Sequence, residues 1–132
     1  MNHLSHDLNL ARRSMGYLSA PHSAATALER NQLCYRALEA SFLLWERGVL
    51  HYCPHANAPT MDLADIETET RMTMGLEVIR RCDWVLMLSD WGKAPECRRE
   101  FNVAQALKIP VVYAVEEAVQ LALLLDRKLN AA

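Results

Sequence analysis

The distribution of apolar residues along the chain predicts strands that alternate with helices. Apolar runs too short for a helix, each bounded by Pro, Gly or polar residues, predict buried strands at 15–20, 49–53, 84–88 and 109–115. Apolar residues that recur every three or four positions predict helices at 24–47, 61–81, 96–107 and 116–129. The pattern therefore indicates an α/β protein.

This alternation is typical of a parallel sheet, because parallel strands are joined by crossover helices that cover both faces. We predict a three-layer α/β domain of the flavodoxin- or Rossmann-like type, with about four strands in the order 2-1-3-4. The order of the strands then reverses between the first and third strands, and ligands bind beyond the carboxyl ends of the strands at such a point. We expect one domain over 15–132, preceded by a polar lead-in over 1–14.

Individual residues mark the expected ends of the elements. Gly48 is expected to stop the first long helix, and Asp62 to cap the start of the second. Gly75 is a weak point inside that second helix. The turn-forming residues at 55–60 predict a loop that covers a site.

Composition narrows the classes of function. The chain has 132 residues, of which 52% are hydrophobic and 23% charged, and these values suit one globular domain. A net charge of −2 argues against nucleic-acid binding as the main role. The four cysteines include no CxxC pair, which favours reduced thiols, and no apolar run is long enough to cross a membrane. We expect a cytoplasmic protein with neither a nucleic-acid nor a membrane partner.

The sequence lacks the common nucleotide-binding motifs, and Pro54 interrupts its one pattern of potential metal ligands. There is no GxGxxG and no GxxxxGK[ST], so a dinucleotide or P-loop site is disfavoured and no cofactor is expected. His51, Cys53 and His55 form an HxCxH pattern that on a straight strand would put three potential ligands on one face. Pro54 interrupts that strand, and we expect no metal there.

Glu96 and Glu100 lie one turn apart on the helix that follows the third strand. They are either solvated helix charges or a partly desolvated pair that faces the crevice. In the second case their mutual approach would raise the pKa of one, giving an acid and a nucleophile on one helix face. Beside them, Cys97 is either a thiol with a lowered pKa at the helix start or an ordinary buried thiol.

Several segments together resemble a known family. They are Tyr17-Leu-Ser-Ala-Pro-His-Ser23, Cys53-Pro54, Cys82-Asp83-Trp-Val-Leu-Met-Leu, Trp91, Glu100 and the strand Pro110-Val-Val-Tyr. This set is similar to the nucleoside 2-deoxyribosyltransferase superfamily, and most of all to its small phage and bacterial branch, which is related to nucleotide N-glycosidases. The resemblance implies the α/β fold predicted above.

The resemblance also implies roles for particular residues. In that family a helix glutamate attacks the anomeric carbon of a nucleoside or nucleotide, and Glu100 matches it, with Tyr17 beside the sugar. The second acid, which protonates the departing base, has no match at the family's position, and Glu77 or Glu96 is the candidate to replace it. The residues expected to bind the substrate are Ser19, Pro21, His22, Asp90, Trp91 and Ala94. Relatives pair their subunits, so we expect a homo-oligomer, a dimer or larger.

Three positions depart from the family pattern and leave the function open. Gly75 stands where the family carries an aspartate, Ala94 where it carries a serine or aspartate, and Glu96 where it carries a small glycine. One possibility is an N-glycosidase, either a hydrolase or a 2-deoxyribosyltransferase, that uses Glu100. The alternative is a catalytically inactive protein, related to phage or host defence, that binds a nucleotide ligand in the same crevice. A purely structural subunit is the third reading.

Overall fold

The computed structural model describes residues 11–131 and contains a parallel sheet of four strands in the order β2-β1-β3-β4. The strands are β1 (Gly16–Ser19), β2 (His51–Tyr52), β3 (Trp84–Met87) and β4 (Val111–Val112). All three strand pairings are parallel, with Tyr17 opposite Tyr52 on one side and opposite Val85 on the other. The predicted strand order is confirmed.

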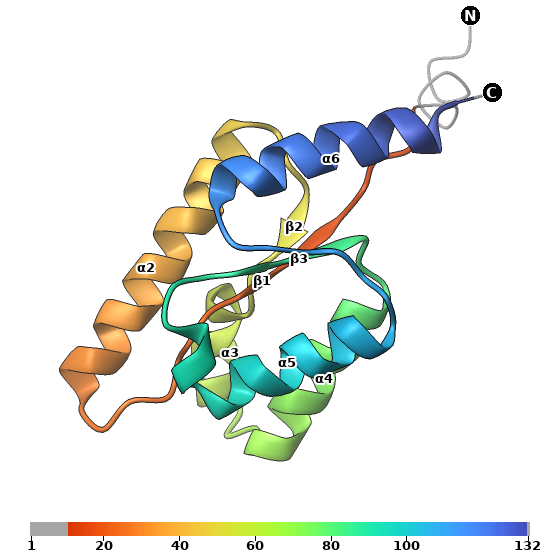
Figure 1. Ribbon diagram of the computed structural model, residues 1–132. Helices are drawn as coiled ribbons and strands as arrows, with labels where there is room; N and C mark the ends of the chain where they lie inside the picture. Colours follow the sequence, from red (N-terminus) through yellow and green to blue (C-terminus); the bar gives the residue numbers. More distant parts are fainter. Residues whose placement is uncertain (1–10, 132) are drawn as a thin grey trace, which may run out of the picture.

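Helices cover both faces of this sheet, as the alternation of elements predicts (Figure 1). One face carries α2 (Ala27–Glu46) and α6 (Val115–Leu129), and the other carries α4 (Thr68–Arg80) and α5 (Pro95–Ala106). The connections hold the short helix α3 (Ala58–Leu63) and the 3₁₀ turns η1 (Pro54–Ala56) and η2 (Trp91–Lys93). The three-layer α/β prediction is therefore correct.

The two central strands form the core because successive side chains point to opposite faces of the sheet. Leu18, Trp84 and Leu86 pack under α2 and α6, while Tyr17 and Val85 pack under α4 and α5. Every residue of β3 is buried, so its side chains supply apolar surface to both layers.

Gly16 makes this packing possible. A Cβ at residue 16 would lie 2.1 Å from the indole ring of Trp84, so only glycine lets that ring lie against β1.

The predicted helix over 61–81 is wrong, because two helices occupy this region. The first, α3, begins at Ala58, and Asp65 then takes a left-handed φ of 54° before α4 begins at Thr68. Asp62 therefore lies inside α3 and caps nothing, while Glu67 is the N-cap residue of α4.

The loop predicted over 55–60 is also wrong, since these residues belong largely to η1 and α3. Pro54 and Pro59 stand in the first turns of η1 and α3, where the fixed φ of proline favours a helical start. This local effect outweighs the turn-forming composition of the segment.

The two outer strands are shorter than the apolar runs that predict them. The runs over 49–53 and 109–115 each contain only two strand residues, His51–Tyr52 and Val111–Val112. Each of these strands pairs on one side only, and α6 already begins at Val115. Beyond the paired positions, Val49 and Cys53 are still buried in the core next to α2, whereas Tyr113 is exposed.

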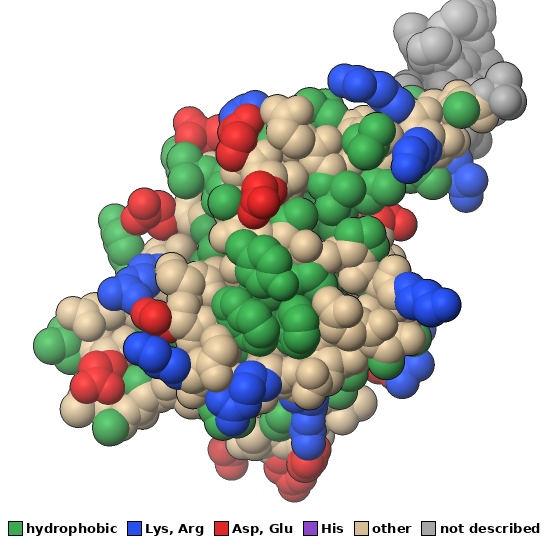
Figure 2. Space-filling model, viewed as in Figure 1, with side chains coloured by type: hydrophobic (Ala, Val, Ile, Leu, Met, Phe, Trp, Pro, Cys, Tyr) green, Lys and Arg blue, Asp and Glu red, His purple; other side chains and the backbone are tan. Residues whose placement is uncertain are grey.

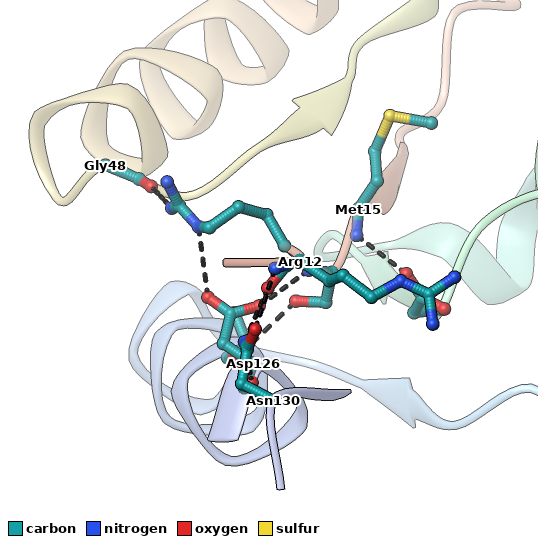
Figure 3. A network of polar contacts seen from close by, with 9 residues as sticks. Arg12, Met15, Gly48, Asp126 and Asn130 are labelled. Atoms are coloured by element: carbon teal, nitrogen blue, oxygen red, sulfur yellow. Dashed lines mark hydrogen bonds and ion pairs between the residues drawn. The ribbon is translucent and has the colours of Figure 1, made fainter. Parts of the chain in front are cut away.

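Residues 12–15 fasten the start of β1 to the end of α6 and to the neighbouring turns (Figure 3). Arg12 and Asn130 exchange two hydrogen bonds of 2.8 Å, and the backbone N–H of Ser14 donates to Asp126 at 2.6 Å. The N–H of Met15 donates to Asp83 at 2.8 Å. The predicted lead-in therefore packs on the edge of the domain over these residues, and its first ten residues lie outside the described ones.

Apolar side chains gather between α5 and α6, where the chain passes through the outer strand β4 (Figure 2). Near this edge Trp91 stacks on Phe101, with ring centroids 4.7 Å apart, and on Tyr113, 6.2 Å away.

No helix within residues 11–131 is long and apolar enough to cross a membrane. The expected homo-oligomer stays a prediction.

Candidate active site

A cavity of about 740 Å³ opens beyond the carboxyl ends of β1 and β2, on the face of the sheet that α4 and α5 cover. Its volume lies in the range of small-molecule sites. Side chains from β1, from the first turns of α2, and from η1, α3, α4 and α5 form its wall. Of the residues at 55–60, His55, Ala58 and Pro59 border this cavity, from η1 and α3.

Glu100 lies in this wall, and each of its carboxylate oxygens accepts a hydrogen bond from a hydroxyl group. Ser19 Oγ donates to Oε1 at 2.7 Å, and the Tyr17 hydroxyl donates to Oε2. Ser19 and Tyr17 are both buried residues of β1, so the central strand fixes the position of a carboxylate on α5. The structure therefore brings together three of the residues that the sequence predicts for the site.

The surroundings of Glu100 raise the pKa of its carboxyl group. Burial is the largest cause, the hydrogen bonds from Tyr17 and Ser19 oppose it, and the charge of Glu96 adds a smaller increase. The pKa of Tyr17 is also raised well above its ordinary value, by burial and by the Glu100 carboxylate, so its phenol keeps its proton and remains a donor. The prediction of a desolvated carboxylate on this helix is confirmed for Glu100, with burial and not Glu96 as the main cause.

Gly75 faces this carboxylate from α4. A Cβ at residue 75 would lie 2.8 Å from the Tyr17 hydroxyl and 3.1 Å from Oε2 of Glu100. A side chain there would displace one of these groups, because the buried Tyr17 ring cannot move freely. Gly75, which the sequence marks as unfavourable inside a helix, is therefore the residue at which the α4 backbone approaches the Tyr17–Glu100 pair closely.

Glu96 has a different environment, although it lies one turn earlier on the same helix. Its Oε2 accepts the backbone N–H groups of His22 at 3.1 Å and Ser23 at 3.0 Å. Burial alone would raise the pKa of Glu96, but its own backbone N–H and those of His22 and Ser23 outweigh burial, and the pKa is lowered. Glu96 is therefore an anion that holds the loop after β1, and this state does not suit the acid role predicted for it.

The histidines of the HxCxH pattern point in different directions. His51 is bonded to Ser41 Oγ at 2.7 Å and to the carbonyl of Val49, away from the cavity, because neighbouring residues of β2 face opposite sides of the sheet and Tyr52 faces the cavity. His55 turns into the cavity wall, and its Nε2 donates to the carbonyl of Pro21 at 3.3 Å. Among residues 11–131, no three His, Cys, Asp or Glu side chains are arranged to hold a metal ion.

His22 and His55 lie together in the cavity wall, with ring centroids 5.8 Å apart. Burial and the neighbouring His22 lower the pKa of His55, so its imidazole is neutral near pH 7. The buried Nδ1 of His55 has no hydrogen-bond partner among the described residues. Since Nε2 carries the proton, Nδ1 is an acceptor, and it is buried out of contact with solvent.

The cavity wall also contains residues that the sequence predictions missed. Tyr52 stacks on Tyr17, with ring centroids 6.0 Å apart, and both rings line the cavity. Arg30, Arg71 and Arg99 line it as well, from α2, α4 and α5. The place of Tyr52 at the carboxyl end of a strand, and that of Arg99 beside Glu100, were the available signals for two of them.

Of the six predicted substrate-binding residues, only His22 lines this cavity. Ser19 lies behind the wall, bonded to Glu100. Trp91 stacks on Phe101 and Tyr113 near β4, and Ala94 is buried in the core under α4 and α5. Asp90 is exposed and lies 3.9 Å from Arg36 of α2. Pro21 borders a smaller cavity of about 170 Å³ under α2 and α6, while its carbonyl accepts the bond from His55. The turn after β3 therefore runs past the site instead of into it.

Cys97 is a buried thiol of the core and not a reactive one. Burial raises its pKa to about 12, so the thiolate is scarce at neutral pH. The second of the two readings of this residue is the correct one.

Comparison with protein-family models assigns the chain to a family. A search of curated proteins found no match. The family model described as a domain of unknown function, DUF4406, matches residues 17–113, a range that begins at Tyr17 and contains Gly75, Glu96 and Glu100. This match covers most of the sequence and nearly all of the sheet and cavity, and the chain therefore belongs to the DUF4406 family.

Proposed function

We propose that the protein is a nucleoside or nucleotide N-glycosidase of the 2-deoxyribosyltransferase type, with Glu100 as its nucleophile. The observation that carries this proposal is a carboxylate in the wall of a large cavity, held at both oxygens by the hydroxyl groups of Tyr17 and Ser19. A carboxylate oriented in this way can attack a carbon atom in a fixed direction. The sequence resemblance assigns the same residue to that role.

In the proposed reaction, Glu100 attacks the anomeric carbon of the sugar and the bond from that carbon to the base breaks. The glycosyl ester on Glu100 is then cleaved by water, or by a second base in a transfer reaction. Tyr17 and Ser19 position the carboxylate by donating hydrogen bonds to it. These bonds also stabilise the ionised form that the attack requires, against the effect of burial.

The arginines of the cavity support a phosphorylated substrate. Arg71 pairs with Asp62 at 2.7 Å. Arg30 and Arg99 form no ion pair with any acidic residue in the described part of the chain, and both line the cavity. Guanidinium groups recognise phosphate through charge and paired N–H donors. Among the two substrate types, a nucleotide is therefore preferred to a nucleoside.

The test is release of free base from a panel of nucleosides and nucleotides with ribose or 2-deoxyribose. Glu100→Gln keeps the shape of the side chain and removes its charge, so we expect a loss on the order of a thousandfold or more. Glu46→Gln, at the exposed end of α2, is the matched control and should release base at the parent rate. Equal rates for Glu100→Gln and the parent would exclude the proposed nucleophile.

A second candidate is a protein that binds a nucleotide ligand without cleaving it. The observation in its favour is Gly75, which leaves no acidic side chain opposite Glu100 on α4. In that case a nucleotide would raise the melting temperature of the protein with no release of base. Thermal unfolding and chromatography on the same samples separate the two candidates.

A further inference from the structure

We infer that the substrate is a nucleotide whose base already carries a positive charge at the glycosidic nitrogen, such as a pyridinium or an N7-alkylated purine. This inference rests on the proposed function and names the class of its substrate. It is based on the lack of a carboxyl group in the cavity that could protonate the base, and on the aromatic side chains that line the cavity.

A neutral purine or pyrimidine leaves as an anion unless an acid protonates it, and enzymes that cleave such bonds supply that acid. The carboxyl groups that line the cavity belong to Asp62, Glu96 and Glu100. Asp62 is exposed and paired with Arg71 at 2.7 Å, and Glu96 accepts two backbone N–H groups. The Asp62 carboxyl is engaged by the Arg71 guanidinium, Glu96 is engaged by the loop backbone, and Glu100 is the nucleophile, so no carboxyl group is left to deliver a proton.

The backbone of α4 excludes a further acid close to the nucleophile. The missing Cβ of Gly75 would collide with the Tyr17 hydroxyl at 2.8 Å and would lie 3.1 Å from Glu100. An acidic side chain at residue 75 is thus incompatible with the bonds that hold the nucleophile. Among the histidines, buried His55 is neutral and its Nε2–H is already bonded to the carbonyl of Pro21.

His22 is the remaining candidate proton donor among the described carboxyl and imidazole groups of the wall. Its Nδ1 lies 3.8 Å from Glu96, and its side chain is 56% exposed. Hydrogen bonds from the backbone N–H groups of His22 and Ser23 fix this loop, but the imidazole itself stays open to water. Glu100, in contrast, lies deep in the wall against β1.

A cationic base needs no acid. When Glu100 attacks the anomeric carbon, the electron pair of the carbon–nitrogen bond returns to the positively charged nitrogen, and the base leaves as a neutral molecule. Water then cleaves the glycosyl ester, giving the free sugar phosphate and one proton to solvent. The half-buried ring of Tyr52, which stacks on Tyr17, and the carboxylates of Glu96 and Glu100 line the cavity in which we expect such a cation to bind.

The experiment compares nucleotides that differ in the charge of the base. Guanosine monophosphate is paired with its 7-methyl derivative, and adenosine monophosphate with nicotinamide mononucleotide, and the guanine pair is also tested as 2-deoxyribonucleotides. Release of base is measured by chromatography and corrected for uncatalysed cleavage. We expect the cationic member of each pair to be cleaved at least about a hundredfold faster, the usual contribution of a general acid.

Three variants complete the design. Glu100→Gln should abolish cleavage of the cationic substrates, and Glu46→Gln should not. His22→Asn should change the rates for cationic and neutral bases by the same factor. Neutral bases cleaved as fast as cationic ones would overturn the inference, and selective loss of that cleavage in His22→Asn would identify His22 as the acid.

A failure of the inference is distinguishable from a failure of the proposed function. Cleavage of neutral bases that depends on Glu100 would contradict the substrate class alone. Release of no base from any substrate, or release that survives Glu100→Gln, would contradict both.

Discussion

The Tyr17 hydroxyl lies 2.8 Å from the point where a Cβ on Gly75 would stand, so the backbone of α4 closes directly over the pair formed by Tyr17 and Glu100. Gly75→Ala is expected to push these groups apart and to lower base release by about tenfold or more. Its effect on stability should be small, because alanine gains up to about 1 kcal/mol in a helix interior and offsets part of the strain. Activity and thermal unfolding are measured together.

Gly92→Ala is the matched control, since no atom lies within 4 Å of the corresponding Cβ. It should leave base release unchanged. If Gly75→Ala and Gly92→Ala behaved alike, the close approach of α4 would have no part in the site.

Glu100→Gln is expected to stabilise the fold at neutral pH. In the unfolded chain Glu100 titrates near its ordinary pKa of 4.5, and burial raises this pKa in the folded protein. Ionised Glu100 therefore costs stability above its folded pKa, and the cost fades as the pH falls through that value towards 4.5. The melting temperature of the variant should exceed that of the parent at about pH 7.5, and the two should converge towards about pH 4. A difference independent of pH would show that ionisation of Glu100 is not its source.

Glu96→Ala is expected to destabilise the fold, in contrast to Glu100→Gln. The carboxylate satisfies two backbone N–H groups of the loop after β1, and its removal should cost about 1–3 kcal/mol in the free energy of unfolding. The pKa of Glu96 is lowered from 4.5, so its contribution is complete above that value and is lost as the pH falls through the folded pKa. Urea denaturation at several pH values measures it, with Glu46→Gln as a control that should change stability by less than about 0.5 kcal/mol.

Arg99→Gln should weaken the binding of phosphorylated substrates. Arg99 lines the cavity, whereas Arg98, one residue earlier on α5, donates to the carbonyl of Gly92 outside it. We expect KM for a nucleotide to rise about tenfold in Arg99→Gln, with little change for the matching nucleoside, because only the nucleotide presents a phosphate. Arg98→Gln is the adjacent control. An equal rise in KM for nucleoside and nucleotide would place Arg99 outside phosphate recognition.

The parts of the fold and of the site that are predictable from the sequence lie in the regular strands and helices. The alternation of apolar runs with segments of helical spacing gives the parallel sheet and its order, and the same pattern puts Tyr17 and Ser19 on one face of β1 and Glu100 on α5. A strand fixes which side chains share a face, and a helix fixes which share a side. These local periods are readable without knowledge of the tertiary structure.

The irregular segments were less predictable because contacts distant in sequence decide them. The Trp91 side chain lies outside the cavity because its ring stacks on Phe101 and Tyr113, and no local sequence pattern reveals these contacts. The break between α3 and α4 depends on Asp65 in a left-handed conformation, inside a segment whose apolar spacing suits a continuous helix. Glu96 reads as a catalytic acid until its partners, the N–H groups of His22 and Ser23, are known.

The two hydrogen bonds between Arg12 and Asn130 have a practical consequence for protein engineering. They hold these residues next to each other, beside the start of β1, while the cavity opens beyond its carboxyl end. A short peptide linker could therefore join Asn130 to Arg12, and the chain could be reopened at the surface turn between α5 and β4. Such a circular permutant would keep Tyr17, Ser19 and Glu100 in place and leave the mouth of the cavity free of new chain ends.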